Sequence, residues 1–173
     1  SYFARFPYLH GAHWYSVDDN KLHFIVLDSN SETREGHAQY NWLLNDLQTV
    51  PAETKFIIVF DHHPLFTTGP HSDDEKGLRE TIMPLFEEYG VNVVFSGHNH
   101  SYERSFNHGI YYIVSAGGGA PLYAQARSSG YSQLYLEEYN FCTLQRVGNK
   151  LIIEALNPQF ELLDRIVIER NQH

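Results

Sequence analysis

Two stretches of this sequence read as buried strands that end abruptly in side chains able to bind metals. The apolar run FIIVF, residues 56–60, leads directly into the polar sequence DHH. Further along, VNVVFSGHNH, residues 91–100, repeats the pattern and ends in two histidines. Short apolar runs with polar boundaries are typical of strands in the interior of a sheet. A polar metal-capable ending on one such strand could be chance, but two call for a common cause.

The segment between the two junctions predicts a loop and a helix. Residues 76–89 carry apolar side chains at helical spacing, and Pro84 predicts a kink or a late start. Strands at 56–60 and 91–95 with a helix between them form a βαβ unit, whose strands are parallel and whose crossover is right-handed in nearly all cases. Both junctions then lie at the carboxyl ends of parallel strands, where ligand sites of open α/β sheets are found.

This placement predicts a metal site. Neighbouring strands lie about 4.8 Å apart, so His62 and His98 could face one metal. His98 and His100 are two positions apart, and on an extended segment both would point the same way, about 6.5–7 Å apart. That spacing would let each reach a different member of a metal pair about 3.5–4 Å apart. A histidine after a strand is more often a surface or hydrogen-bonded residue, and only the joint pattern favours ligation.

The rest of the chain predicts α/β structure first and antiparallel β structure afterwards. A hairpin is expected from strands 13–17 and 22–28, with a polar turn at 18–20. A helix follows from the spacing of apolar residues at 40–47. Later come a strand running into the loop GGGAP, a hairpin that turns at Gly148-Asn149, and a last strand in DRIVIER. We expect a single domain over residues 1–173.

Composition excludes several classes of function. The formal net charge is −9, from 21 acidic and 12 basic residues, which disfavours a nucleic-acid-binding face. The single cysteine, Cys142, rules out an intrachain disulfide and a cysteine-based zinc site. No apolar run reaches the roughly 18 residues that a membrane-spanning helix needs. We therefore expect neither a nucleic acid nor a membrane as partner.

Several motifs resemble one known family. FDHHPLF, VVFSGHNHSYERS, AQYNWLLNDL and the GGGAP loop are similar, in order and spacing, to calcineurin-like metallophosphoesterases, especially the purple-acid-phosphatase-like branch. The resemblance covers roughly residues 1–125. It implies part of a four-layer αββα sandwich, with a βαβ unit followed by antiparallel strands. It also implies hydrolysis of a phosphorylated small molecule or other phosphoester by water activated at two divalent or mixed-valence metals (Fe, Zn or Mn), in an exported or periplasmic protein.

The resemblance assigns roles to individual residues. His62 and His98 would bind one metal and His100 the other. His71 matches family histidines that contact phosphate and is the expected catalytic residue. His63 matches a variable position, so a supporting or loop role is expected for it. Residues 102–104 are expected to brace the loop, and Gly117–Gly119 to form a tight turn.

The sequence also departs from the family pattern. No Asp-x-His segment precedes the first junction, and the family's Gly-Asp-x-x-Asp or -Tyr and Gly-Asn-His segments do not occur here. We therefore expect the C-terminal portion of a catalytic domain, with only half of the metal site. Such a half-site could bind one zinc-like ion weakly. A missing N-terminal half, or a second copy of the chain, would cover the apolar face that this portion exposes.

Two other functions compete with this interpretation. The chain could be a non-catalytic module, derived from such an enzyme, that binds a metal or a partner. A nuclease of the His-Asn-His kind is the second, because residues 98–100 spell HNH. That motif name describes residues dispersed over a ββα-metal unit, so a contiguous triplet after a buried strand does not fit it.

Overall fold

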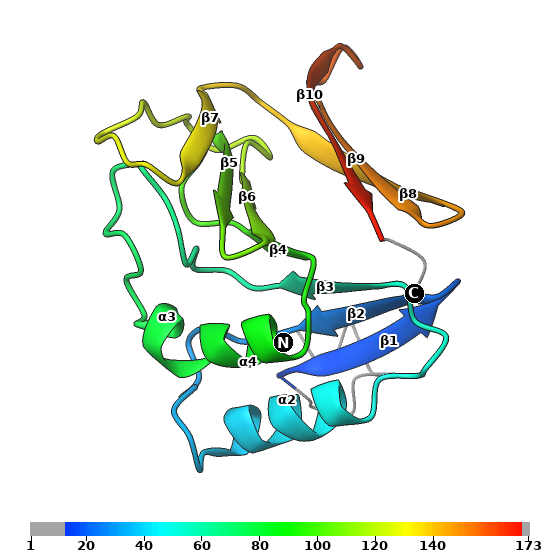
Figure 1. Ribbon diagram of the computed structural model, residues 1–173. Coiled ribbons are helices and arrows are strands. Elements are labelled where there is room, and N and C mark those ends of the chain that lie inside the picture. Colours follow the sequence, from blue (N-terminus) through cyan, green and yellow to red (C-terminus); the bar gives the residue numbers. More distant parts are fainter. Residues whose placement is uncertain (1–12, 171–173) are drawn as a thin grey trace, which may run out of the picture.

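The computed structural model describes residues 13–170, and in them ten strands form two sheets (Figure 1). The large sheet has the order β1-β2-β3-β4-β6-β5-β7, and the small sheet has the order β10-β9-β8. The strands of the large sheet are β1 (Tyr15–Asp19), β2 (Leu22–Val26), β3 (Phe56–Phe60), β4 (Val93–Ser96), β5 (Tyr102–Asn107), β6 (Ile110–Ser115) and β7 (Ser132–Leu136). Those of the small sheet are β8 (Phe141–Val147), β9 (Lys150–Leu156) and β10 (Leu162–Glu169).

The centre of the large sheet is parallel. Strands β2, β3, β4 and β6 run in one direction, and Phe60 at the end of β3 lies opposite Phe95 of β4. The connection from β3 to β4 contains the helices α3 (Leu78–Thr81) and α4 (Met83–Glu88). The βαβ unit predicted from the sequence is therefore present. Its two polar junctions meet at one edge of the sheet.

Two cores cover the two faces of the large sheet. On one face, α2 (Ala38–Gln48), α3 and α4 pack on apolar residues such as Ile25 and Val59. On the other face, the small sheet packs on residues such as Ile58 and Phe95 (Figure 1). Alternate residues of each strand serve alternate cores, as the side-chain period of a strand requires. The described residues thus supply a helical layer and two sheet layers of the expected αββα sandwich.

The predicted helix over 76–89 is divided in two. α3 ends at Thr81, Ile82 lies between the helices, and Pro84 falls within the first turn of α4. Proline lacks the N–H that an interior helical position must donate, but at the start of a helix that N–H has no partner to lose. The sequence predicted a kink or a late start at Pro84, and the structure shows an interruption at Ile82 with a second helix that begins at Met83.

The turns differ in detail from the predictions. Between β1 and β2 the turn residues are Asn20 and Lys21, both with positive φ, so the predicted turn at 18–20 is displaced. Two positive φ values suit the two-residue hairpin turn whose twist matches that of the strands. A similar turn at His108-Gly109 joins β5 and β6. Strands β5 and β7 were not predicted. Among residues 13–170, no helix is long and apolar enough to span a bilayer.

Candidate metal centre

Three histidines meet where β3 and β4 end. His62 and His63 follow β3, and His98 follows β4. The ring centroids of His62 and His98 are 5.2 Å apart, and those of His63 and His98 are 4.5 Å apart. One ligand atom from each of the three rings lies within 4.8 Å of the other two. The parallel register of the sheet thus brings His62 and His98 together as predicted, and it adds His63 to the same cluster.

The backbone that carries His98 is not extended. β4 ends at Ser96, and His98 has φ +67°. The Asn99 N–H donates to the Gly97 carbonyl at 2.8 Å, and the Ser101 N–H donates to the Asn99 carbonyl at 2.7 Å. These bonds between residues two positions apart mark successive tight turns. The prediction that His98 and His100 lie on an extended segment and point the same way is therefore wrong.

His100 lies apart from the three-histidine cluster. Its ring stacks on Tyr123, with centroids 4.4 Å apart and planes 14° apart. Its Nδ1 lies 2.9 Å from the Pro121 carbonyl oxygen. A carbonyl can only accept, so Nδ1 carries the proton and Nε2 of the neutral ring keeps its lone pair. A hydrogen bond of this kind orients a ligating histidine in known metal sites.

His71 also approaches His98. Their ring centroids are 4.0 Å apart, and the His71 N–H donates to Asn99 Oδ1 at 3.2 Å. Glu75 completes a second group with them, because His98 Nε2 lies 3.1 Å from Glu75 Oε2. Sequence reasoning missed Glu75, since nothing in the pattern of an exposed polar loop distinguishes one carboxylate from its neighbours.

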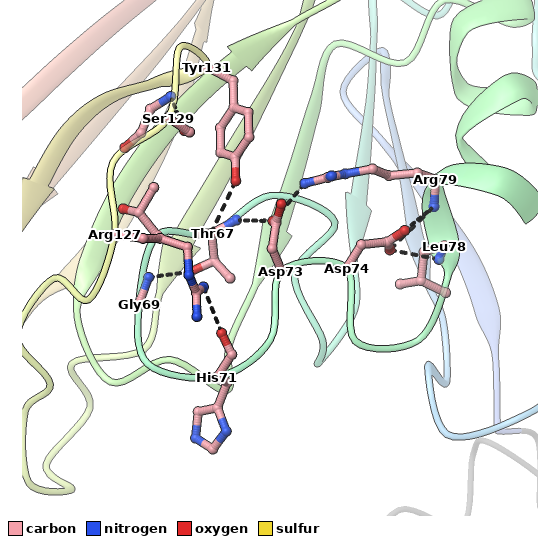
Figure 2. A network of polar contacts seen from close by, with 12 residues as sticks. Thr67, Gly69, His71, Asp73, Asp74, Leu78, Arg79, Arg127, Ser129 and Tyr131 are labelled. Atoms are coloured by element: carbon pink, nitrogen blue, oxygen red, sulfur yellow. Dashed lines mark hydrogen bonds and ion pairs between the residues drawn. The ribbon is translucent and has the colours of Figure 1, made fainter.

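A polar network holds the loop that bears His71 (Figure 2). Asp73 accepts a hydrogen bond from the Thr67 N–H at 3.0 Å and pairs with Arg79 at 2.6 Å. Arg127 donates to the His71 carbonyl at 2.8 Å. Figure 2 shows the imidazole of His71 pointing away from these contacts. The network therefore fixes the backbone and leaves the ring free for the site.

Glu103 supports the same loop from beneath. Its fully buried carboxylate accepts hydrogen bonds from the Thr68 N–H and from the hydroxyls of Thr67, Thr68 and Ser132. This contact confirms that part of the 102–104 segment braces the loop. Arg104 instead pairs with Asp164 of the small sheet at 2.6 Å.

Asn99 ties the two loops of the site together. It is fully buried, and its amide donates to Thr67 Oγ1 at 3.1 Å while its Oδ1 accepts from His71. A Cβ at Gly69 would lie only 2.5 Å from that Oδ1, so the contact requires glycine there. The middle residue of the HNH triplet is thus a structural residue, which argues against the nuclease interpretation.

The surroundings favour neutral imidazoles at His62 and His63. Burial, followed by the neighbouring His98, lowers the pKa of His62. The same two causes lower the pKa of His63 to about 4. A neutral imidazole is the form that binds metals, and it suits zinc, copper, nickel and iron. The donor set therefore fits a transition metal.

Comparison with known proteins places the chain in a family. The family model for calcineurin-like phosphoesterases matches residues 2–102, more than half of the chain. The chain belongs to the calcineurin-like phosphoesterase family. Purple acid phosphatase 1 of Ipomoea batatas is 35% identical over 130 residues, which cover 69% of this chain and 28% of that relative. The Fe(3+)-Zn(2+) purple acid phosphatase 12 of Arabidopsis thaliana is 38% identical over 94 residues, which cover 53% of this chain and 20% of that relative.

A solved structure shows the same fold. The purple acid phosphatase PPD1 from seeds of yellow lupin (Lupinus luteus) superposes with a TM-score of 0.85 at 23% identity. The match covers 91% of this chain and 33% of that one. The metallophosphoesterase fold expected from the sequence is therefore confirmed. The chain spans about a third or less of the length of these relatives.

Proposed function

We propose that this chain is the C-terminal portion of the catalytic domain of a metal-dependent phosphoester hydrolase with a binuclear centre. His62 and His98 would hold one metal, His100 the other, and His71 would contact the phosphate. The observation that carries the proposal is the meeting of His62 and His98 at the carboxyl edge of the parallel strands, with ring centroids 5.2 Å apart.

The metals, Fe, Zn or Mn, would lower the pKa of a bound water and neutralise charge on the phosphate. The chain's own residues orient the reactants. The bond from His100 to the Pro121 carbonyl leaves Nε2 as the ligand atom. Asn99 holds the backbone of His71 so that its ring lies beside His98, at a centroid distance of 4.0 Å. His71 can then donate a hydrogen bond to a phosphate oxygen.

A metal pair needs carboxylate ligands that bridge or complete it. Glu75 is the one carboxylate that joins a three-residue cluster within residues 13–170. The remaining ligands would therefore come from sequence outside this chain or from a second copy. The mixed metals named for the Arabidopsis relative support an iron-zinc pair as one form of the complete centre.

The small sheet offers a surface for that missing partner. Leu162 and Val167 on β10 are 55% and 47% exposed, and Phe141 on β8 is also exposed. An N-terminal half of the domain, or self-association, would cover these side chains. Export to a periplasmic or extracellular compartment stays a prediction from the family resemblance.

A non-catalytic metal-binding module is the second candidate. It is favoured by the three-imidazole cluster of His62, His63 and His98, which contains no carboxylate. Such a cluster could bind one zinc ion, and a single ion lacks the second metal of the binuclear mechanism.

Metal content together with turnover of p-nitrophenyl phosphate separates the two candidates. The wild-type chain is compared with the double variant His98→Ala, His100→Ala and with the control His108→Asn, an exposed histidine in the β5–β6 turn. The hydrolase is supported if the wild type and the control contain metal and turn over substrate, and the double variant loses both. Metal bound through these histidines without turnover favours the module, and absence of metal from the wild type contradicts both.

A further inference from the structure

The hydroxyl of Ser29, just after β2, makes three contacts at the end of β3. Its Oγ lies 2.8 Å from His63 Nδ1, 3.1 Å from the His63 backbone N and 3.3 Å from the His62 backbone N. Ser29 and His63 are only 4% and 5% exposed. One buried hydroxyl thus contacts both members of the His-His pair.

The hydrogen atoms of these contacts can be assigned. A serine hydroxyl has two lone pairs and one proton. The two backbone N–H groups can only donate, so they occupy both lone pairs of Oγ. The Ser29 proton must then point to His63 Nδ1, which accepts it and carries no proton of its own. The neutral ring of His63 consequently carries its proton on Nε2.

This assignment conflicts with metal ligation by His63. A ligating ring nitrogen needs a free lone pair. Nδ1 is occupied by Ser29, and Nε2 carries the proton. To bind a metal through Nε2, His63 would have to move its proton to Nδ1 and give up the Ser29 bond, leaving a buried hydroxyl without an acceptor. His62, whose side chain makes no such bond to Ser29, has no such obstacle.

We propose that His63 is a hydrogen-bond donor to the substrate and not a metal ligand, and that Ser29 is the positioning residue that fixes its tautomer. The proposal rests on the proposed function, and it names the group recognised as a non-bridging oxygen of a phosphate bound beside the metals. The His63 ring lies 4.8 Å from that of His62 and 4.5 Å from that of His98, measured between centroids. A neutral N–H at this place binds an oxyanion without adding a positive charge next to the metal ions.

The tautomer can be measured directly. Long-range ¹H–¹⁵N NMR spectra of the histidine rings distinguish Nε2–H from Nδ1–H in the chain with and without zinc. We expect Nε2–H for His63 in both states, retention in Ser29→Thr and loss in Ser29→Ala. The Thr variant keeps the hydroxyl, so it separates a positioning role from a general effect on folding. A bare Nε2 in the wild type, or loss of its proton when zinc is added, would overturn the proposal.

Binding measurements test the role of the donor. We expect His63→Asn to keep zinc affinity within about threefold, and to weaken binding of inorganic phosphate to the zinc-loaded chain about tenfold, the effect of one hydrogen bond to a charged group. His62→Ala should lose at least about tenfold in zinc affinity, and His108→Asn should change neither quantity. A large loss of zinc affinity in His63→Asn would overturn the inference alone. A wild-type chain that binds no zinc would overturn the proposed function and the phosphate role together.

Discussion

The buried carboxylate of Glu103 binds Thr68 twice, accepting from its backbone N–H at 3.0 Å and from its hydroxyl at 2.6 Å. In Glu103→Gln, the amide N–H₂ that replaces one carboxylate oxygen is a donor and would face other hydrogen-bond donors. The Thr68 N–H cannot reorient, because it is fixed by the backbone. We expect the free energy of unfolding to fall by about 1–3 kcal/mol. Urea unfolding measures it, with the exposed Glu137→Gln as control. Equal stability of the two variants would contradict the bracing role.

His23 connects two acidic side chains at the opposite edge of the sheet from the histidine cluster. Its Nδ1 lies 2.8 Å from Asp18 Oδ1, and its Nε2 lies 2.9 Å from Asp46 Oδ2. Burial opposes the charged ring, but the bonds to Asp46 and Asp18 outweigh it and raise the pKa of His23 above 6.5. Protonation of His23 therefore stabilises the fold. This contribution is complete below about pH 6.5 and is lost as the pH rises through the raised pKa.

The pH dependence of stability tests this contact. We expect His23→Asn to be less stable than the wild type at pH 6, by about 1–3 kcal/mol, and the difference to shrink by pH 9. Urea unfolding at both pH values measures it, and His108→Asn serves as the exposed-histidine control. A difference that stays constant or grows with pH would show that the ring acts by packing alone.

Arg79, whose ion pair with Asp73 is drawn in Figure 2, also contacts an aromatic ring. Its guanidinium carbon lies 3.9 Å from the centroid of the Phe66 ring while the same group pairs with Asp73. Lysine keeps the charge but not the planar group that stacks. We expect Arg79→Lys to lower the free energy of unfolding by about 1 kcal/mol. The matched control is Arg165→Lys, whose ion pair with Glu154 is exposed, and a loss of the same size there would refute the stacking argument.

The exposed apolar residues of β10 predict association. The wild-type chain should elute above its monomer mass of 20.0 kDa in size-exclusion chromatography with light scattering. Val167→Lys should shift the population towards the monomer, because it places a charge on the apolar surface that the partner would cover. Arg165→Lys, on the same strand, should leave the mass unchanged. A wild-type chain that is monomeric at every concentration would count against a covered face.

The parts of the fold set by local pattern were predictable. β3 was expected at 56–60 and lies there. Both faces of this strand are covered by a core, so all five of its residues must be apolar, and only this run of the sequence meets that requirement locally. The parallel pairing of β3 and β4 followed from the helix between them. β5 (Tyr102–Asn107) was not predicted because two of its buried side chains, Glu103 and Ser105, are polar, so the segment lacks the apolar alternation typical of a strand. Its pairing with β6 and β7 decides its structure.

The site was predictable in outline and not in detail. His62 and His98 meet because sheet register puts them together. The turn at His98 depends on the contacts of Asn99 with Thr67 and His71, about thirty residues away in sequence, and no local pattern encodes them. The position of His63 depends similarly on Ser29, which lies in the turn after the neighbouring strand β2. Long-range polar contacts of this kind decide which way a side chain faces once the strands are in place.

The pairing of β3 with β4 also governs the order in which the site can form during folding. The two strands can pair only when the loop and helices between them close as a crossover. Closing this loop lowers the conformational entropy of the chain before the strand contacts contribute any stabilisation. His62 and His98 are therefore far apart until the sheet exists. A metal ion bound through both would arrive late on the folding pathway, so it would slow unfolding of the finished domain and leave the rate of folding nearly unchanged.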